Sequence, residues 1–453
     1  MMSMAFSFAI DIYGCQMNQY DGDRLRTSLI RRGWIETDRN EADAVVIVTC
    51  SIREKAEQKV LSEIGRYGKL YKTKGKPLLA VIGCMAQNMG ADLLRRFPQV
   101  KVVAGPRHIG WVPDALENAM RHKTVLYLDE DPREMIDLHD APMIRSNPYK
   151  AFVTIAHGCD NFCTYCIVPY VRGRFVSRRP SEILKEVSEL VDDGVLEVTL
   201  LGQNVDSYGK DLKESYRFSN LLRDVAKVPR LLRVRFTTSH PRDFTEDVIK
   251  VMAEESKICP AVNLPIQSGS DRILKKMNRG YTVEDYGRII KRLREALPEV
   301  SITSDLIVGF PGETEEDFQC TLEMLKTMEF DLVHTASYSP REGTPAANMP
   351  DQIPEEEKKR RLSIVNELQD AISFKKNKIL EGKFFEVLLD DFAPKGKGML
   401  QGRTLTDKVV LVPGDESMLG KLCEVRITGA SNWYLYGEIV SFRDFSDVLE
   451  VRI

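Results

Sequence analysis

Short runs of apolar residues alternate with amphipathic segments in the first 105 residues of the chain. The apolar runs lie at Phe6–Tyr13, Ala44–Val48, Pro77–Ile82 and Val100–Ala104. The segments between them have helical periodicity and lie at Asp21–Arg32, Arg53–Leu70 and Ala91–Phe97. Buried strands that alternate with helices are typical of a parallel sheet covered on both faces. The pattern therefore predicts a Rossmann-like parallel α/β domain.

After an irregular stretch at 106–148, the same alternation restarts at Ala151. Apolar runs lie at Ala151–Ala156, Leu196–Leu201, Leu232–Thr237, Ala261–Ile266, Val300–Val308 and Leu332–Ser337. Helical segments lie at Ser181–Asp193, Glu246–Glu255, Thr282–Ala296 and Thr314–Met328. This succession predicts a partial (β/α) barrel, whose active site we expect at the C-terminal ends of its strands.

The last part of the chain has a different pattern. A long charged helix is predicted at Glu355–Leu380, and from Phe384 onward short strands alternate with turn residues. This predicts a small C-terminal β-barrel, of the OB type or similar. The predicted domains are therefore an N-terminal domain at 1–145, the barrel at 146–380 and the small β-barrel at 381–446.

Composition and charge narrow the class of protein. The chain has no run of about 18 apolar residues, and no basic flank precedes the N-terminal apolar run, so we predict a cytoplasmic protein. The formal net charge of −3 gives no overall attraction to nucleic acid, so any such site must be a local basic patch. Nine cysteines in a reducing compartment favour metal or redox chemistry over disulfides.

Three cysteines lie close together directly after the first strand of the predicted barrel. Cys159, Cys163 and Cys166, called here the compact triad, have the spacing C-x3-C-x2-C. Three thiolates so close can hold one metal centre. A zinc site requires a fourth ligand nearby, and His157 is the candidate. On a four-iron cluster, three ligands leave one iron open. Three unrelated core cysteines are the remaining alternative.

Three further cysteines, called here the dispersed triad, share a local context. Cys15, Cys50 and Cys84 each follow an apolar run of the N-terminal domain. The C-terminal ends of parallel strands line one edge of a sheet, so we expect these thiols to converge. Gly14 and Gly83 are expected to leave room for a bulky cluster. The alternative is that each cysteine is simply a buried residue. Cys259, Cys320 and Cys423 share no such context, and we interpret them as structural.

The compact triad at the start of a barrel resembles the radical S-adenosylmethionine enzymes. The resemblance implies that the open iron binds S-adenosylmethionine and that Tyr165 lies near its adenine. It also implies that Gln203 and Asn204, in the segment 199–204, lie at its methionine end. Polar residues at strand ends are candidates for ribose contacts, although such residues also serve as helix caps. They are Ser239, Gln267 and Asp305.

The three predicted domains together resemble the methylthiotransferase family of radical S-adenosylmethionine enzymes. The segment Gly14–Asp21 is similar to the N-terminal signature of the family, although Asp21-Gly22-Asp23 replaces its usual Asp-Ser-Glu. Further segments are similar to the branch that acts on isopentenylated adenosine in tRNA. They are Cys50–Ala56, Phe236–Pro241, Tyr338–Arg341 and Gly343–Ala346.

The resemblance implies a reaction and its cofactors. A methylthio group would be added to carbon 2 of N6-isopentenyladenosine next to the anticodon, with two [4Fe-4S] clusters and two uses of S-adenosylmethionine. Acid–base groups supply about 10²–10⁴-fold, too little to open such a C–H bond, so no side chain is expected to act as catalytic acid or base. An electron donor such as flavodoxin or ferredoxin is implied. The alternatives are a methylthiotransferase acting on an aspartate of a ribosomal protein and a non-enzymatic, zinc-containing RNA-binding protein.

The C-terminal domain resembles the TRAM domain, a small RNA-binding β-barrel, through the runs 401–404, 409–411, 425–427 and 435–437. Basic residues that could contact RNA phosphates there include Lys395, Lys397 and Arg403. Arg172, Arg174, Arg178 and Arg179 follow the compact triad and are either phosphate contacts or partly structural ion pairs. The target adenine is expected to be splayed out of its stack to reach the active site.

Overall fold

The computed structural model describes residues 6–51, 54–121, 123–128, 143–213, 215–394 and 398–443, with the backbone alone at 54–56. The chain forms two compact units. The first comprises Met1–Ser146, Ala156–Phe162 and Cys166–Val176, and the second comprises Asn147–Ile155, Cys163–Tyr165 and Ser177–Ile453. No helix in the described ranges is long and apolar enough to cross a membrane.

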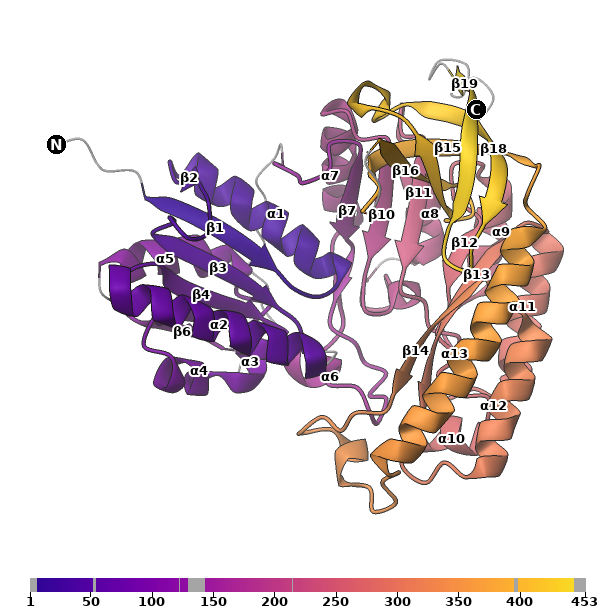
Figure 1. Ribbon diagram of the computed structural model, residues 1–453, viewed down its shortest axis with the longest axis horizontal. Coiled ribbons are helices and arrows are strands. Elements are labelled where there is room, and N and C mark those ends of the chain that lie inside the picture. Colours follow the sequence, from indigo (N-terminus) through magenta and orange to yellow (C-terminus); the bar gives the residue numbers. More distant parts are fainter. Residues whose placement is uncertain are drawn as a thin grey trace. The chain divides into compact units, whose positions relative to one another are not determined.

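The first unit is built on a parallel sheet of six strands in the order β2-β1-β3-β4-β5-β6 (Figure 1). The strands are β1 (Ser7–Ile12), β2 (Ile35–Glu36), β3 (Ala44–Thr49), β4 (Leu78–Gly83), β5 (Val100–Ala104) and β6 (Val125–Tyr127). The helices are α1 (Gln16–Arg31), α2 (Glu54–Lys74), α3 (Cys84–Met89), α4 (Ala91–Arg96) and α5 (Val112–Met120). A short helix, α6 (Val168–Val171), follows the compact triad.

Alternate residues of the central strands enter two separate cores. Val46 and Val48 of β3 pack on one face with residues of α1 and α5, such as Leu25 and Leu116. Val45 and Ile47 pack on the other face with α2 and α4. The sheet is therefore buried on both faces, which explains why its strands are continuous apolar runs in the sequence.

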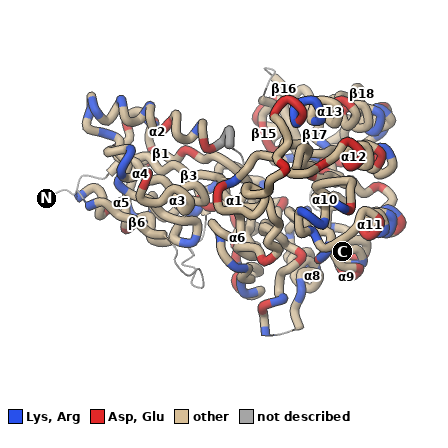
Figure 2. The backbone as a smooth tube through the Cα atoms, turned by 90° about the horizontal axis from the view of Figure 1, so that it is seen from below, with Lys and Arg blue, Asp and Glu red and all other residues tan. Residues whose placement is uncertain are grey.

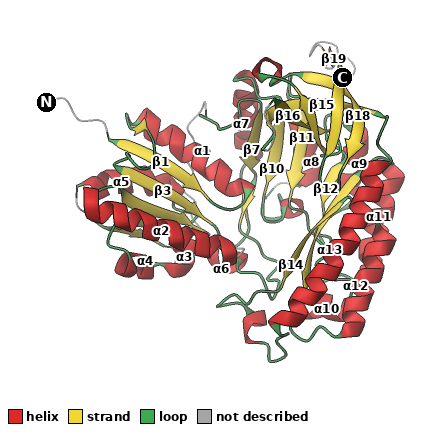
Figure 3. Ribbon diagram, viewed as in Figure 1, coloured by secondary structure: helices red, strands yellow, loops and turns green. Residues whose placement is uncertain are grey.

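The second unit contains six parallel strands in two three-stranded sheets, with the orders β11-β10-β7 and β12-β13-β14. The strands are β7 (Lys150–Thr154), β10 (Glu197–Leu201), β11 (Arg233–Thr237), β12 (Ala261–Asn263), β13 (Ser301–Val308) and β14 (Leu332–Ser337). The helices are α7 (Pro180–Asp192), α8 (Phe218–Ala226), α9 (Glu246–Glu254), α10 (Asp271–Lys276), α11 (Val283–Ala296), α12 (Glu315–Met328) and α13 (Glu355–Lys378). This confirms the predicted partial (β/α) barrel (Figure 3).

A closed five-stranded barrel ends the second unit, with the strand order β15-β16-β17-β19-β18. Its strands are β15 (Phe384–Phe392), β16 (Met399–Thr404), β17 (Val409–Pro413), β18 (Leu422–Ala430) and β19 (Leu435–Arg443). Its interior is filled by aliphatic side chains such as Val387, Leu400 and Val425. The small β-barrel expected from the sequence is confirmed.

Buried arginines join this small barrel to the parallel strands. Arg233, the first residue of β11, is fully buried and donates to the carbonyl of Arg403 at 2.8 Å and to Glu386 Oε1 at 3.0 Å. Arg235 donates to the carbonyl of Thr404 at 2.8 Å. Because these contacts involve the beginning of β11, the small barrel lies at the N-terminal ends of the strands. The C-terminal ends, where a (β/α) barrel holds its active site, are left free of it.

Candidate functional site

The dispersed triad lies at the C-terminal ends of three neighbouring strands. Cys15 is the N-cap of α1 after β1, Cys50 directly follows β3, and Cys84 is the first residue of α3 after β4. The three strands are adjacent in the sheet, so their ends lie side by side. The side chains of Cys50 and Cys84 are buried, whereas that of Cys15 is partly exposed. The sheet therefore brings together three thiols that are far apart in sequence.

Two glycines allow these strand ends to approach each other. Gly14 has φ of 125°, and a Cβ there would lie 2.5 Å from Cys50 Cβ. Gly83 has φ of 99°, and a Cβ there would lie 2.5 Å from the carbonyl oxygen of Thr49. Both the conformation and the space exclude a side chain. The glycines thus bring the strand ends into contact, and the expectation that they leave room for a cluster stays a prediction.

Asn18, in the first turn of α1, connects the three strand ends and is buried. Its amide nitrogen donates to the carbonyl of Tyr13 at 2.6 Å and to that of Thr49 at 3.0 Å, one residue before Cys50. Its amide oxygen accepts from Arg172 at 3.1 Å and faces Cys15 Sγ at 3.8 Å. Sequence reasoning missed Asn18 as a functional residue, although it lies within the Gly14–Asp21 segment.

Arg172 is the cation of this site. Its side chain is buried, and its Nε donates to Cys84 Sγ at 3.2 Å. Burial alone would lower the pKa of Arg172, but the negative charges of Cys84, Cys15 and Asp21 raise it well above its ordinary value. Burial raises the pKa of the Cys84 thiol, and Arg172 opposes this shift. The arginine expected at an RNA phosphate is therefore buried against a predicted cluster ligand.

Three thiols beside a buried cation are a donor set of the type that iron–sulfur clusters use. Among the residues with described side chains, no three His, Cys, Asp or Glu groups are arranged to hold one metal ion. Soft thiolates next to a buried cation suit such a cluster, because iron–sulfur centres use cysteine ligands and carry a net charge.

The compact triad lies in the loop after β8 (Ala156–His157). Cys159 and Cys163 are buried, Cys166 is partly exposed, and the backbone N–H of Cys159 donates to the carbonyl of Gly173 at 3.1 Å. Cys163 Sγ accepts from Nη1 of the buried Arg279 at 3.4 Å. Arg279 also donates to the carbonyl of Pro265 at 2.6 Å and contacts the hydroxyl of Tyr165 at 3.4 Å. Both triads therefore have one thiol that accepts from a buried arginine.

The strand-end residues predicted to hold S-adenosylmethionine lie where expected along the second unit. Asn204 and Ser239 are buried in the loops after β10 and β11. Asn204 donates to Asp243 at 2.7 Å, and Ser239 donates to Asp206 at 3.3 Å. Gln203 precedes Asn204 in the same loop. The side chains of Asn204 and Ser239 thus also connect the loop after β10 with the loop after β11 by hydrogen bonds.

Gln267 and Asp305 belong to the other half of the barrel. Gln267 has φ of 76°, and its backbone N–H donates to the carbonyl of Asp305 at 2.9 Å. The carboxylate of Asp305 accepts from Asn263 at 3.2 Å. Tyr165 packs against a small core that includes Met277 and Phe310.

Buried polar atoms without a partner gather at the strand ends of the second unit. Within the described residues, these atoms lack a hydrogen bond and belong to residues at or just after β7, β10, β11, β12 and β14. They are Thr154 Oγ1, Asn204 Oδ1, His240 Nε2, Gln267 Oε1 and Tyr338 Oη. Buried polar atoms are normally satisfied, so this edge suits a polar ligand such as S-adenosylmethionine. Thr154, His240 and Tyr338 were not predicted, and their strand-end positions were the available signal.

Asp206 and His240 have strongly shifted pKa values. Burial raises the pKa of Asp206 to about 7, with the charge of Asp243 adding to the shift and the backbone N–H of His240 opposing it. Burial and the charge of Arg279 lower the pKa of His240 to about 2. The imidazole is therefore neutral at physiological pH, while Asp206 is close to its titration point.

The predicted RNA contacts differ in exposure. Arg174 is largely exposed, forms an ion pair with Asp160 at 2.7 Å and lies over the ring of Phe162 at 5.6 Å. Arg403 is partly exposed and pairs with Asp407 at 3.0 Å. Lys395 and Lys397 lie outside the described residues. Figure 2 shows Lys and Arg interspersed with Asp and Glu along the chain.

Large apolar side chains are exposed on the small C-terminal barrel. They are Phe384, Phe392, Trp433, Tyr436 and Phe442. Aromatic faces of this kind can stack with unpaired bases.

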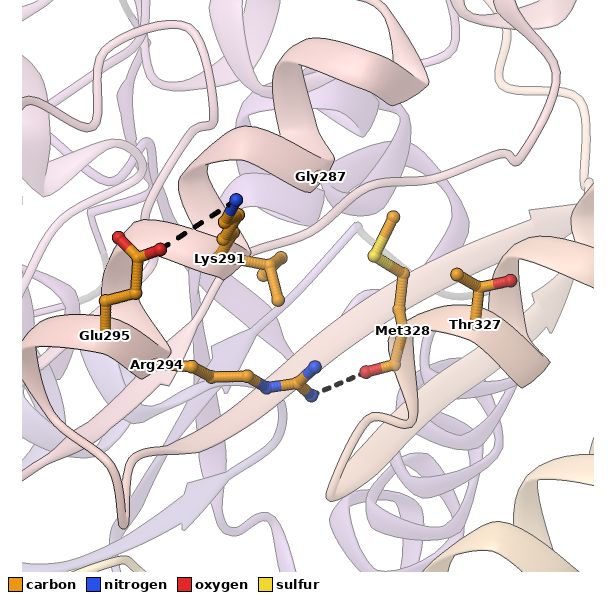
Figure 4. Close-up of a pocket in the computed structure, with 7 residues that line it drawn as sticks. Gly287, Lys291, Arg294, Glu295, Thr327 and Met328 are labelled. Atoms are coloured by element: carbon orange, nitrogen blue, oxygen red, sulfur yellow. Dashed lines mark hydrogen bonds and ion pairs between the residues drawn. The ribbon is translucent and has the colours of Figure 1, made fainter.

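One pocket of about 500 Å³ lies away from all of these residues, between α11 and the end of α12 (Figure 4). Its lining consists of Gly287, Ile290, Lys291, Arg294, Glu295, Thr327 and Met328. Arg294 donates to the carbonyl of Met328, and Lys291 pairs with Glu295 at 4.0 Å. None of the predicted site residues lines this pocket, so it is not the candidate active site.

Comparison with known proteins defines the class first. Residues 153–325 match the Radical SAM superfamily, residues 7–105 match "Uncharacterized protein family UPF0004" and residues 378–440 match the TRAM domain. The radical S-adenosylmethionine methyltransferase TsrM from Kitasatospora setae, with tryptophan and an S-adenosylmethionine analogue bound, has a similar fold. Its TM-score is 0.54 at 15% identity, over 75% of each chain. The chain thus has the fold of the radical S-adenosylmethionine superfamily. The enzymes of this superfamily use a [4Fe-4S] cluster and S-adenosylmethionine.

Full-length relatives define the family. The tRNA-2-methylthio-N(6)-dimethylallyladenosine synthase of Moorella thermoacetica is 46% identical over 438 residues, covering 96% of this chain and 98% of the relative. The protein of the same name from Carboxydothermus hydrogenoformans is 45% identical, covering 96% of this chain and 99% of the relative. The chain belongs to the family of tRNA-2-methylthio-N(6)-dimethylallyladenosine synthases. The resemblance inferred from the sequence is confirmed.

Proposed function

We propose that this protein adds a methylthio group to carbon 2 of N6-isopentenyladenosine next to the anticodon of tRNA. The observation that carries the proposal is the 46% identity to a synthase of that name over 96% of the chain. The two relatives described above are named for the tRNA reaction, which favours it over methylthiolation of a ribosomal aspartate. Both are also named as enzymes, which disfavours a non-enzymatic zinc protein.

The proposed cofactors are two [4Fe-4S] clusters and S-adenosylmethionine. The compact triad would hold one cluster, and Cys15, Cys50 and Cys84 would hold the auxiliary cluster. When bound, the two clusters would supply the electron that cleaves S-adenosylmethionine and an iron that holds sulfur. The protein contributes the thiolates, two buried guanidinium groups and the polar strand ends around the cofactor.

Within the first unit, the segment that follows Cys166 packs against the dispersed triad. Cys84 packs against Ile167 and Val171, and Ile167 is the residue next to Cys166. The same unit contains Cys159, Cys166 and the whole dispersed triad.

The residues proposed to hold S-adenosylmethionine are those at the strand ends of the second unit. They are Tyr165, Gln203, Asn204, Ser239, Gln267 and Asp305. The partnerless buried atoms of Asn204 and Gln267 support this assignment, because the cofactor carries amino, carboxylate and ribose groups.

The proposed domains remain 1–145, 146–380 and 381–446, with the last binding tRNA through its TRAM fold. The residues proposed to contact RNA are Arg174, Arg403, Lys395 and Lys397. Arg172 is buried and is given a different role below. A flavodoxin or ferredoxin is the proposed electron donor, and the cytoplasm is the proposed location.

Anaerobic reconstitution with iron and sulfide tests the proposal. The wild-type chain is expected to bind about eight irons, as two four-iron clusters that each have three cysteine ligands and one open iron, and to methylthiolate isopentenylated tRNA. Cys15→Ala should abolish methylthiolation and keep formation of 5′-deoxyadenosine, whereas Cys159→Ala should abolish both. Cys320→Ala, at an exposed cysteine, is the matched control. Modification of the ribosomal peptide with no reaction on tRNA would refute the proposed substrate.

A further inference from the structure

Asn18 and Arg172 form a continuous polar network through the dispersed triad. The Asn18 side chain binds the backbone before Cys15 and before Cys50, and it accepts from Arg172, which in turn donates to Cys84. Cys15 faces the amide oxygen of Asn18, and Cys84 accepts from Arg172. Cys50 directly follows Thr49, whose carbonyl accepts from Asn18.

The position of Arg172 is costly unless an anion faces it. A guanidinium stays protonated in proteins, and burying it without a partner is strongly unfavourable. Besides Cys84, the side chain of Arg172 contacts Asn18 and the sulfur of Met17 at 3.8 Å, and the charge of Asp21 also acts on it. A neutral thiol is a weak acceptor, whereas a cluster thiolate accepts strongly. The arginine is thus suited to a negatively charged sulfur at Cys84.

A second arginine fixes the backbone of this segment. Arg107, in the loop after β5, donates to the carbonyl of Arg172 at 2.8 Å and to that of Arg174 at 2.7 Å. Val171, the residue before Arg172, packs against Cys84. The segment after the compact triad is therefore held against the dispersed triad by both polar and apolar contacts.

We propose that Asn18 and Arg172 are positioning residues of the auxiliary cluster. Asn18 holds the strand ends that carry Cys15 and Cys50, and Arg172 donates to the sulfur of Cys84 and stabilises the more negative, reduced state of the cluster. This inference rests on the proposed function, because it requires a cluster at the dispersed triad. Arg172 also makes retention of that cluster dependent on the segment that follows Cys166.

The test uses the full-length chain with Cys159, Cys163 and Cys166 changed to Ala, so that iron is bound by the dispersed triad alone. Arg172→Met removes the charge, Arg172→Lys keeps the charge but loses the planar fork, and Asn18→Ala removes the link between strand ends. Arg95→Met changes an exposed arginine of the same unit and is the matched control. Each variant is reconstituted anaerobically with ferrous iron and sulfide.

The readouts are iron per chain, the rate of iron loss to a chelator, and the midpoint potential followed by electron paramagnetic resonance. Arg172→Met is expected to lose iron about 10- to 100-fold faster than the parent and to have a lower midpoint potential. Arg172→Lys should be intermediate. Asn18→Ala should lose iron faster with a smaller change in potential, since the arginine charge remains. Arg95→Met should behave as the parent.

A purely structural arginine would change thermal stability and leave the potential of the remaining cluster unchanged, which would overturn the inference. If Arg172→Met does not fold, Arg172→Lys decides, and equality with Arg95→Met in both iron loss and potential overturns the inference. A parent chain that binds no iron refutes the auxiliary cluster of the proposed function itself. A parent with four irons and unresponsive Arg172 variants refutes the inference alone.

Discussion

Replacing Arg233 by Met should detach the small C-terminal barrel from the parallel strands. The side chain of Arg233 is fully buried, and it donates to the carbonyl of Arg403 and to Glu386. Its loss leaves the largely buried Glu386 with Arg443 at 3.4 Å as its remaining ion pair. Breaking a buried ion pair typically costs about 3–5 kcal/mol, because one charge stays buried without its partner.

Calorimetry measures the expected loss of stability of Arg233→Met as a fall in Tm. For a unit of this size each kcal/mol lowers Tm by about 2–4 °C, so a fall of about 6–20 °C is expected. Arg230→Met is the control, because Arg230 forms a solvent-exposed ion pair with Asp192, and such pairs contribute about 0–1 kcal/mol. Limited proteolysis near residue 381 should accelerate in Arg233→Met and not in the control.

A double variant tests the reasoning itself. If the cost comes from Glu386 losing its contact with Arg233, Arg233→Met combined with Glu386→Gln should be less destabilised than the sum of the single variants. Additive losses, or a Tm of Arg233→Met within about 2 °C of the Arg230→Met value, would refute the role of this buried pair.

Three further predictions concern the sites. Gly14→Ala should reduce iron bound by the dispersed triad, measured in the chain without the compact triad, because its Cβ would lie 2.5 Å from Cys50 Cβ; a full complement of iron would contradict this. Asp206, whose folded pKa is raised to about 7 from 3.8, contributes stability that is complete below about pH 4 and is lost as pH rises through 7. Asp206→Asn should therefore flatten the decline of Tm between pH 5 and 8, and a parallel decline would argue against the raised pKa. Arg279→Met should weaken iron retention at the compact triad about 10- to 100-fold and leave the dispersed triad unchanged; equal loss at both triads would contradict a local effect.

The pattern of apolar runs in the sequence predicted where the dispersed triad lies. Apolar runs before Cys15, Cys50 and Cys84 predicted parallel strands, and parallel strands place their C-terminal ends at one edge. The helix limits were less accurate. α1 begins at Gln16 rather than Asp21, because Cys15 is its N-cap, and the segment 91–97 is preceded by a separate helix that starts at Cys84.

The hydrogen-bond partners of the buried arginines could not be predicted from local sequence patterns. Arg172 follows a cysteine motif, and the sequence suggests a surface cation. In the structure its side chain is buried, and its partner Cys84 lies 88 residues earlier in the chain. Arg233 similarly lies in strand β11, and its partners Glu386 and Arg403 lie in the small C-terminal barrel. Spacing along a chain carries no information about such long-range contacts.

The sequence by itself determined the alternation of strands and helices, the C-terminal β-barrel, the spacing of the compact triad and the family. These depend on local periodicity and on residues that are near one another in the chain. The tertiary structure alone decided that strand order places Cys15, Cys50 and Cys84 on adjacent strands, that Asn18 connects their ends and that Arg172 faces a thiol. The physical reason is that packing and burial, which set the partners of polar groups, act between segments that are far apart in the sequence.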